Sequence, residues 1–316
     1  MRQIWTVPTV SKGGKYLKNL ENKKFWIWFS LIKNLGCRRK LKLLKIYKNP
    51  EIIYKLSKEK LIEVEGIGED TANNIIISKN EKLLDYHINY MLRNNIDIIN
   101  IQDKEYPQIL KEIYDPPISL YIKGNKNILN NTSIGIVGCR QCTEYGEKAA
   151  KYFSYNLAKQ KINIVSGLAK GIDSYAHIGC LAANGKTIAV VGNGLDTIYP
   201  KENLEIANKI IASKGAIISE YPCGSKPDKM NFPARNRIIS GISSGIIVVE
   251  AKEKSGTLIT VDFALEHGRD VFVVPGNINS MNSVGTNNLI KQGGRMVVTY
   301  EDVLGELFEK VDKIEK

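Results

Sequence analysis

The amino-acid sequence predicts an α/β protein, in which a small all-α domain precedes an open, doubly wound domain with a mainly parallel sheet. Two observations support this prediction. Before residue 80 the apolar residues recur at helical spacing, whereas from residue 133 onward short, continuously apolar runs alternate with helical patterns. A strand that is apolar along its whole length is buried on both faces, which is typical of a parallel sheet covered by helices.

The second part of the chain contains six short apolar runs that we expect to be strands. They cover residues 134–137, 162–165, 187–191, 216–219, 246–250 and 271–274. Helical patterns separate them at residues 145–159, 171–184, 200–213, 235–243 and 257–267. In such a fold the ligand binds at the carboxyl ends of the strands, so the loops after the strands are where function is expected.

The first part of the chain is expected to be helical from residue 25 to residue 78. Within it, the segment 61–72 carries Gly66 and Gly68 in the pattern of a helix-hairpin-helix turn. Glycines permit the tight turn and expose N–H groups that can meet a phosphate. Acidic side chains in the same turn, Glu65 among them, would repel phosphate, so we favour a packing role for it.

These patterns divide the chain into five segments. We expect a basic tail at 1–22, a helical helix-hairpin-helix-like domain at 23–82, a connector packed on the sheet at 83–131, a doubly wound sheet domain at 132–310 and a short C-terminal tail at 311–316. A short apolar run at 118–122 is expected to add one strand within the connector.

Charge is distributed unevenly along the chain. The net charge is +12, and residues 1–60 contain 16 Lys and Arg against three Glu, so the rest of the chain is close to neutral. Such an asymmetry suggests nucleic acid or an anionic membrane as a partner, although a Lys-rich surface can also serve solubility alone. No apolar run is long enough to span a membrane, and five scattered cysteines favour a reducing cytoplasm over a disulfide framework.

Glycine-rich loops follow three of the expected strands. Gly138 follows the first strand, Gly167 the second and Gly194 the third, and each precedes a helix. Exposed N–H groups at helix N-termini favour anions. Basic residues and one aromatic ring accompany these loops, namely Arg140, Lys170, Lys201, Lys229, Phe232, Arg235 and Arg237. Together they predict a groove in which phosphates meet cations and a base stacks on Phe232.

Several enzyme signatures are present only in part. Residues 192–197 approximate a dinucleotide-binding fingerprint, but its third glycine is replaced by Thr197. Asp173 and His177 share one expected helix face, a spacing that suits an acid–base pair or a capping carboxylate beside a hydrogen-bonded histidine. Cys139 and Cys142 have redox spacing but lack the second pair that a zinc site needs. We expect no catalytic residue, no metal site and no cofactor.

The loops together resemble a known family. Gly138-Cys-Arg140 with Thr143-x-Tyr145-Gly146 is similar to a motif of the DNA-processing protein A family (DprA/Smf). Further motifs of that family match at residues 166–177, 192–203, 232–239, 255–260, 268–276 and 285–290. Seven ordered motifs over about 160 residues make the resemblance specific.

The resemblance implies an extended Rossmann-like sheet domain and a cytoplasmic, non-enzymatic protein. Members bind single-stranded DNA, protect incoming strands during natural transformation and help to load RecA recombinase, typically as homodimers. By motif, Arg140, Lys229 and Phe232 are the expected strand contacts. The other residues expected in the site are Gly138, Ser166, Gly167, Asn193, Gly194, Lys170, Lys201, Arg235, Asn236 and Arg237.

Two departures from the family pattern are visible. Position 139 is Cys where the family usually has Ser, and a thiol is the weaker hydrogen-bond donor. We also expect no winged-helix domain after residue 310, although many members continue into one. Two other functions remain open from the residues: a nucleotide-binding hydrolase on a related fold, and an interaction scaffold that binds DNA through its basic N-terminus.

Overall fold

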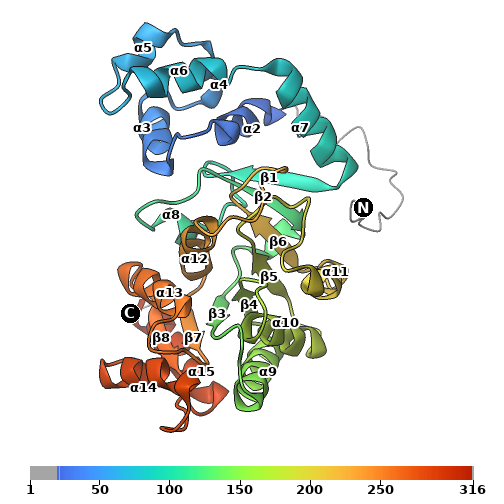
Figure 1. Cartoon of the computed structure of the whole chain (residues 1–316), viewed down its shortest axis with the longest axis vertical. Helices are drawn as coiled ribbons and strands as arrows, with labels where there is room; N and C mark the ends of the chain where they lie inside the picture. Colours follow the sequence, from blue (N-terminus) through green and yellow to red (C-terminus); the bar gives the residue numbers. More distant parts are fainter. Residues whose placement is uncertain (1–19, 21, 315–316) are drawn as a thin grey trace.

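A computed structural model describes residue 20 and residues 22–314 of the chain. A helical domain lies at one end of the molecule, and below it the sheet runs toward the other end (Figure 1). The expected tail at 1–22 lies outside the described residues except at its end. There Leu20 is buried in the same apolar cluster as the helical domain, so this residue has a packed role that we did not expect.

From Lys24 onward the helical domain contains six short helices. They are α2 (Lys24–Leu31), α3 (Cys37–Tyr47), α4 (Pro50–Lys55), α5 (Lys58–Ile62), α6 (Glu69–Ile77) and α7 (Glu81–Arg93). Side chains that accept a backbone N–H mark three of their beginnings: Asn49 caps α4, Ser57 caps α5 and Asn80 caps α7. The glycine turn between α5 and α6 contains Gly66 at φ +87°, a conformation that favours glycine.

The sheet has nine strands. They are β1 (Ile96–Asn100), β2 (Ser119–Gly124), β3 (Ser133–Val137), β4 (Asn163–Ser166), β5 (Thr187–Val190), β6 (Ala216–Ser219), β7 (Gly245–Val248), β8 (Asp270–Val273) and β9 (Arg295–Met296). Their order across the sheet is β1-β2-β6-β5-β4-β3-β7-β8-β9. The pairs β1–β2 and β2–β6 are antiparallel, and all the other pairs are parallel.

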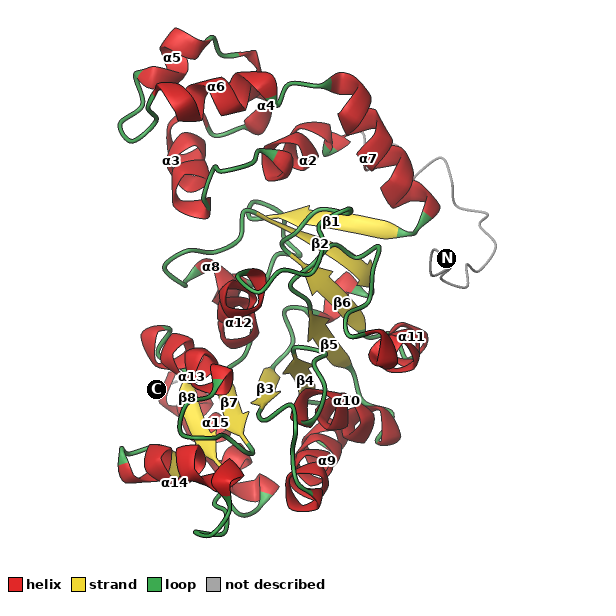
Figure 2. Ribbon diagram, in the orientation of Figure 1, coloured by secondary structure: helices red, strands yellow, loops and turns green. Residues whose placement is uncertain are grey.

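Helices cover both faces of the sheet (Figure 2). One apolar cluster joins the sheet to α9 (Glu144–Lys159), α10 (Ile172–Ala182) and α15 (Tyr300–Ile314), and another joins it to α8 (Gln108–Lys111), α12 (Asn231–Gly241), α13 (Gly256–Glu266) and α14 (Val284–Lys291). Helix α11 (Leu204–Ala212) packs beside β5 and β6. The described residues also contain three 3₁₀ turns: η1 (Lys126–Ile128), η2 (Lys201–Asn203) and η3 (Met281–Ser283).

The predicted fold is confirmed, with differences at the edges. All six strands expected in the sheet domain are present, as are the helices between them. The boundary expected at residue 82 falls inside α7, and the one expected at 310 falls inside α15. The connector also contributes β1, which we did not expect. A strand of only five residues at the edge of a sheet repeats the strand pattern too few times to be recognised from sequence alone.

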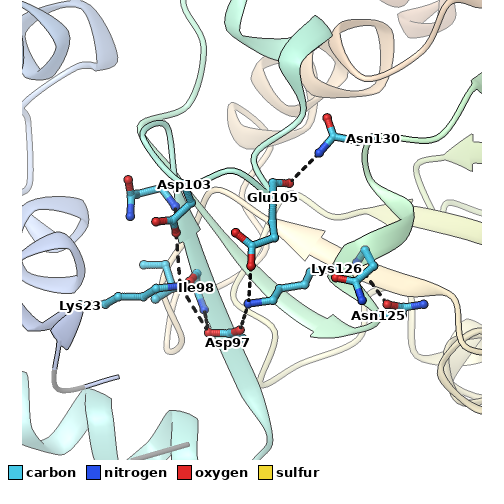
Figure 3. A network of polar contacts seen from close by, with 10 residues as sticks. Lys23, Asp97, Ile98, Asp103, Glu105, Asn125, Lys126 and Asn130 are labelled. Atoms are coloured by element: carbon cyan, nitrogen blue, oxygen red, sulfur yellow. Dashed lines mark hydrogen bonds and ion pairs between the residues drawn. The ribbon is translucent and has the colours of Figure 1, made fainter. Parts of the chain in front are cut away.

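A network of ion pairs joins the helical domain to the sheet (Figure 3). Lys23, which precedes α2, donates to the carbonyl oxygen of Ile98 in β1 at 2.5 Å and pairs with Asp103 at 3.2 Å. Lys126 pairs with Asp97 at 3.1 Å and with Glu105 at 3.4 Å. Among residue 20 and residues 22–314, none of the helices has both the length and the apolar character that crossing a membrane requires.

His177 is part of the core and is held neutral. It lies in α10, is fully buried, and its Nδ1 is 2.7 Å from Thr187 Oγ1. The Thr187 hydroxyl donates to the carbonyl oxygen of Ile164, so Nδ1 carries the proton. Burial, with a further contribution from the charge of Arg235, lowers the pKa of His177 to about 3.

We therefore predict that His177 makes stability depend on pH. The unfolded chain binds a proton at His177 below about pH 6.5, whereas the folded chain does so only near pH 3, so stability is lost as the pH falls through this window. His177→Asn keeps a donor to Thr187 and should reduce the slope of unfolding free energy against pH by up to about 1.4 kcal/mol per pH unit.

Urea unfolding of both proteins at about pH 5 and about pH 7 measures this difference. If the slope is the same in the variant, His177 binds a proton as readily in the folded chain as in the unfolded chain, which would contradict the prediction.

Candidate nucleic-acid interface

The strand order reverses at β3, which pairs with β4 on one side and with β7 on the other. The loops after β3 and β7 diverge there and leave a crevice at the carboxyl edge of the sheet. A groove of about 840 Å³ occupies this crevice. Its walls come from the loop after β3, the beginning of α12, and the segment between β7 and α13.

Two stacked aromatic rings form one wall of the groove. Phe232, in the first turn of α12, stacks on Tyr199 with ring centroids 5.6 Å apart and planes inclined by 26°. The guanidinium carbon of Arg140 lies 5.8 Å from the centroid of Phe232. Phe232 is half-buried, and Tyr199 is 45% exposed. A flat apolar surface thus lies beside a cation, the combination that binds unpaired bases next to phosphates.

Cations surround these rings. Lys229, Lys252 and Lys254 line the groove, are exposed, and form no ion pair with any other described residue. Arg140 is also exposed and has no carboxylate partner in the described part of the chain. Lys170 differs, because its Nζ lies 2.5 Å from a carboxylate oxygen of Glu202. Four cations are therefore available to an anionic ligand without breaking an internal ion pair.

Glu250 fixes the loop that carries Arg140. Glu250 follows β7 in the sequence and is 1% exposed. One carboxylate oxygen accepts the Thr143 hydroxyl at 2.6 Å, and the other accepts the Thr143 N–H at 2.9 Å. The backbone carbonyl of Glu250 accepts the N–H of Cys139 at 2.9 Å. The loop is thus held on both sides of Arg140, and the carboxylate also suits the N-terminus of α9.

The surroundings of Glu250 leave its carboxylate no room to move. Asn282 donates to this carboxylate at 3.4 Å and to the carbonyl oxygen of Gln141 at 2.8 Å. A Cβ added at Gly146 would lie 2.5 Å from the same carboxylate. Gly146 is therefore required for close approach of α9 to Glu250.

Arg235 forms the floor of the groove. Arg235 is buried, and one of its guanidinium nitrogens donates to the carbonyl oxygens of Gly167, at 2.5 Å, and Val190. Asp173 accepts the N–H groups of Gly167 and Ala169 beside it. Burial lowers the pKa of Arg235 to about 10, while the charge of Asp173 opposes that change. Arg235 lines the groove and also holds the ends of β4 and β5, so its expected role as a strand contact stays a prediction.

The structure brings the expected site residues together only in part. Gly138, Arg140, Lys170, Lys229, Phe232, Arg235 and Asn236 line the groove, and Gly167 lines a smaller hollow beneath Arg140 and Phe232. Five expected residues do not line either space, namely Ser166, Asn193, Gly194, Lys201 and Arg237.

Most of these five serve the scaffold instead. The Ser166 hydroxyl donates to Ile136, and the Asn193 amide donates to Gly194 and Thr197. Arg237 is buried and pairs with Glu220 at 2.6 Å and Asp115 at 3.2 Å. We expect Arg237 in the site, near the beginning of the helical pattern at 235–243. The helix begins at Asn231 instead, so Arg237 lies in its second turn, where it is buried.

Groups suited to catalysis are occupied or buried. Asp173 is hydrogen-bonded as described, and His177 is neutral in the core. Burial raises the pKa of the thiols of Cys139 and Cys142, which does not suit a reactive thiolate. Within the described residues, no group of three or more His, Cys, Asp or Glu could hold a metal ion.

Three groove residues were missed by the sequence analysis. Tyr199, Lys252 and Lys254 line the groove, and none of them was expected there. All three follow strand ends. The two lysines follow β7, which lies beside β3 where the strand order reverses. Placing β7 next to β3 would have predicted that these lysines lie at the groove.

Comparisons with known proteins agree with this geometry. The model of a family described as DNA recombination-mediator protein A matches residues 97–308, and one described as a SAM-like helix-hairpin-helix tandem matches residues 30–78. A protein named Smf from Synechocystis is 39% identical over 90% of this chain and 72% of its own length. A DNA processing protein DprA from Bacillus subtilis is 45% identical over 68% of this chain and 72% of its own length.

Two solved structures are similar. The crystal structure of DNA processing protein A from Streptococcus pneumoniae has a TM-score of 0.80 at 37% identity and covers 90% of this chain and 97% of its own. A structure of DNA processing protein A from Helicobacter pylori, described by its single-stranded DNA binding mode, has a TM-score of 0.61 at 30% identity. It covers 68% of this chain and 97% of its own.

We predict that Glu250 acts on the groove through Arg140. Glu250→Gln removes one acceptor from the loop, so it should weaken binding of a labelled oligo-dT several-fold. If the carboxylate acts by placing Arg140, the effects of Glu250→Gln and Arg140→Ala should be less than additive in a double-mutant cycle measured by fluorescence anisotropy.

The matched control is Glu253→Gln, which makes the same charge change at an exposed neighbouring position. Full additivity of the two changes, or an equal loss in the control, would contradict a positioning role for Glu250.

Proposed function

The chain belongs to the DNA recombination-mediator protein A family, and we propose that it holds single-stranded DNA in the groove between the loops after β3 and β7. One observation carries this proposal. The stacked rings of Tyr199 and Phe232 form one wall of a groove in which four cations, Arg140 and Lys229 among them, have no ion-pair partner in the described part of the chain.

The arrangement suits a strand with unpaired bases. Phosphates are attracted to the four free cations, while a base that is not paired can stack on the outer face of Phe232. The closely spaced rings of Tyr199 and Phe232 leave no room for a base between them, so the base adds to the end of the stack. Contacts of this kind do not distinguish one base from another, and sequence preference should be low.

The groove continues in a direction that a strand can follow. A second hollow of about 370 Å³ shares Arg140, Gln141 and Lys170 with the groove and leads toward α10. A free mononucleotide would need only one of these spaces. The pair of connected spaces therefore supports a polymeric ligand.

The alternative, a nucleotide hydrolase, needs an acid or base free to act in the groove. Asp173 is the carboxyl group in the groove lining, and both hydrogen bonds of its Oδ2 are made to the backbone of the loop after β4. This occupancy supports binding over hydrolysis.

We extend the proposal to the partners that family membership suggests. The bound strand would be passed to RecA recombinase in the cytoplasm during DNA uptake, by a homodimer that presents two grooves and gains avidity. Exposed apolar side chains at the far end of the sheet support an interface there, namely Ile278, Met281, Met296 and Val298. Light scattering of the purified protein, and RecA filament assembly on coated DNA, test these two steps.

The first test of the groove itself is fluorescence anisotropy of labelled oligo-dT across a salt series, with duplex and mononucleotide competitors. We expect binding that weakens with salt and prefers single strands. Displacement by a mononucleotide would instead favour the hydrolase.

We predict that Arg140→Ala and Lys229→Ala each weaken binding to every sequence. Each substitution removes one phosphate contact, so each should reduce the salt slope by about 0.7. Lys209→Ala is the matched control, because Lys209 already pairs with Glu205 on α11. Unchanged affinity and slope in both groove variants would contradict the site.

We also predict a salt-independent loss for the aromatic wall. Phe232→Ala should cost about 1–3 kcal/mol of binding free energy, while Phe232→Tyr keeps a stacking face and most of the affinity. Since stacking involves no counterion release, the salt slope of both variants should match that of the parent protein. A changed slope in Phe232→Ala would show that the ring acts by placing Arg140.

A further inference from the structure

Helix α3 of the helical domain presents a basic face that the groove does not use. Leu43 and Leu44 are buried, whereas Arg38, Arg39 and Lys45 are exposed. Successive residues on a helix are rotated by about 100°, so Arg38 and Lys45 lie within about 20° of each other, and Arg39 lies about 100° from Arg38 at the edge of the exposed side.

Several lysines of the helical domain have carboxylate partners, whereas these three cations of α3 have none among the described residues. Lys42 pairs with Glu65, Lys55 with Glu51, Lys58 with Glu69 and Lys60 with Glu63. In the part of the chain that the structure describes, Arg38, Arg39 and Lys45 form no ion pair. Three exposed cations without ion-pair partners on one short helix attract an anion.

An exposed aromatic ring lies against this face. Tyr114, in the loop after α8, is 72% exposed, and the guanidinium carbon of Arg38 lies 4.5 Å from the centroid of its ring. A large side chain exposed to this extent has one ring face and an edge available for contact. The arrangement repeats that of Arg140 and Phe232 in the groove, again with unpaired cations beside the ring.

The basic face is connected to the groove by rigid elements. Phe232 lies in the first turn of α12, and Arg237, in the second turn of the same helix, pairs with Asp115 next to Tyr114. Five residues of helix separate the two, a rise of about 7.5 Å. Figure 1 shows α3, α8 and α12 following one another along one side of the molecule.

We propose that the exposed face of α3, with Tyr114, is a second binding site for single-stranded DNA, engaged by a strand long enough to extend beyond the groove. The inference rests on the proposed function, because it assigns a further segment of the same ligand. Phosphates would meet Arg39 and Lys45, and a base would stack on Tyr114.

A single strand fits the observations better than other polyanions. A duplex offers phosphates to the cations, but its bases are stacked on one another and cannot reach Tyr114. An acidic peptide would meet the cations and leave the ring unused. The exposed ring therefore decides in favour of unpaired bases.

Oligonucleotide length separates this site from the groove. Anisotropy with an oligo-dT of about six nucleotides reports the groove alone, and one of about 30 nucleotides reports both sites. For Arg39→Ala/Lys45→Ala we expect unchanged binding of the short strand, weaker binding of the long strand, and a salt slope for the long strand reduced by about 1.4. Tyr114→Ala should weaken the long strand about 5- to 20-fold, and Tyr114→Phe should restore it.

The matched control is Lys55→Ala/Lys60→Ala, which removes two paired cations from the same domain. Equal losses for this control, or unchanged binding of the long strand in the α3 variants, would overturn the second site. An equal loss of duplex binding would overturn the assignment to single strands. Failure of the short strand to bind the parent protein would instead contradict the groove, so the two proposals fail separately.

Discussion

The buried guanidinium of Arg235 is the interaction on which the groove depends. It reaches from α12 to the carbonyl oxygens at the ends of β4 and β5, beside the carboxylate of Asp173. A buried arginine must find acceptors for its donors, since an unpaired charge in the interior is costly. The two hydrogen bonds of this side chain therefore hold α12 against the strand ends, and with it Phe232 above the floor.

A rigid floor has a consequence for how the ligand is held. The strand ends and the loop fixed by Glu250 present acceptors and N–H groups that are already occupied. What remains available is charge on long, exposed side chains and the outer face of one ring. Such a surface binds through phosphates and stacking, which every strand supplies, so a fixed scaffold here produces tolerance of sequence.

The sequence predicted the parallel sheet well because buried strands and covering helices leave strong periodic patterns. It also placed Arg140, Lys229 and Phe232 in the groove, because loops after parallel strands meet at one edge. It could not separate Arg235 and Arg237 from surface cations, because the acceptors that bury them lie far away in sequence. Tyr199 was missed for the same reason, since only the fold brings it onto Phe232.

The contacts between the helical domain and the sheet restrict the movement of α3, which carries the second site. Lys40 of α3 is buried between the two, where desolvation lowers its pKa to about 8 while the charge of Glu220 opposes that change. The thiol of Cys37, at the start of α3, lies 2.5 Å from the carbonyl oxygen of Pro116. These contacts, with the ion pairs of Lys23, leave α3 little freedom to move relative to the sheet. A strand that binds both sites therefore loses flexibility, but the protein does not have to rearrange. The free-energy cost of ordering is then lower than if both the strand and the protein had to be ordered on binding.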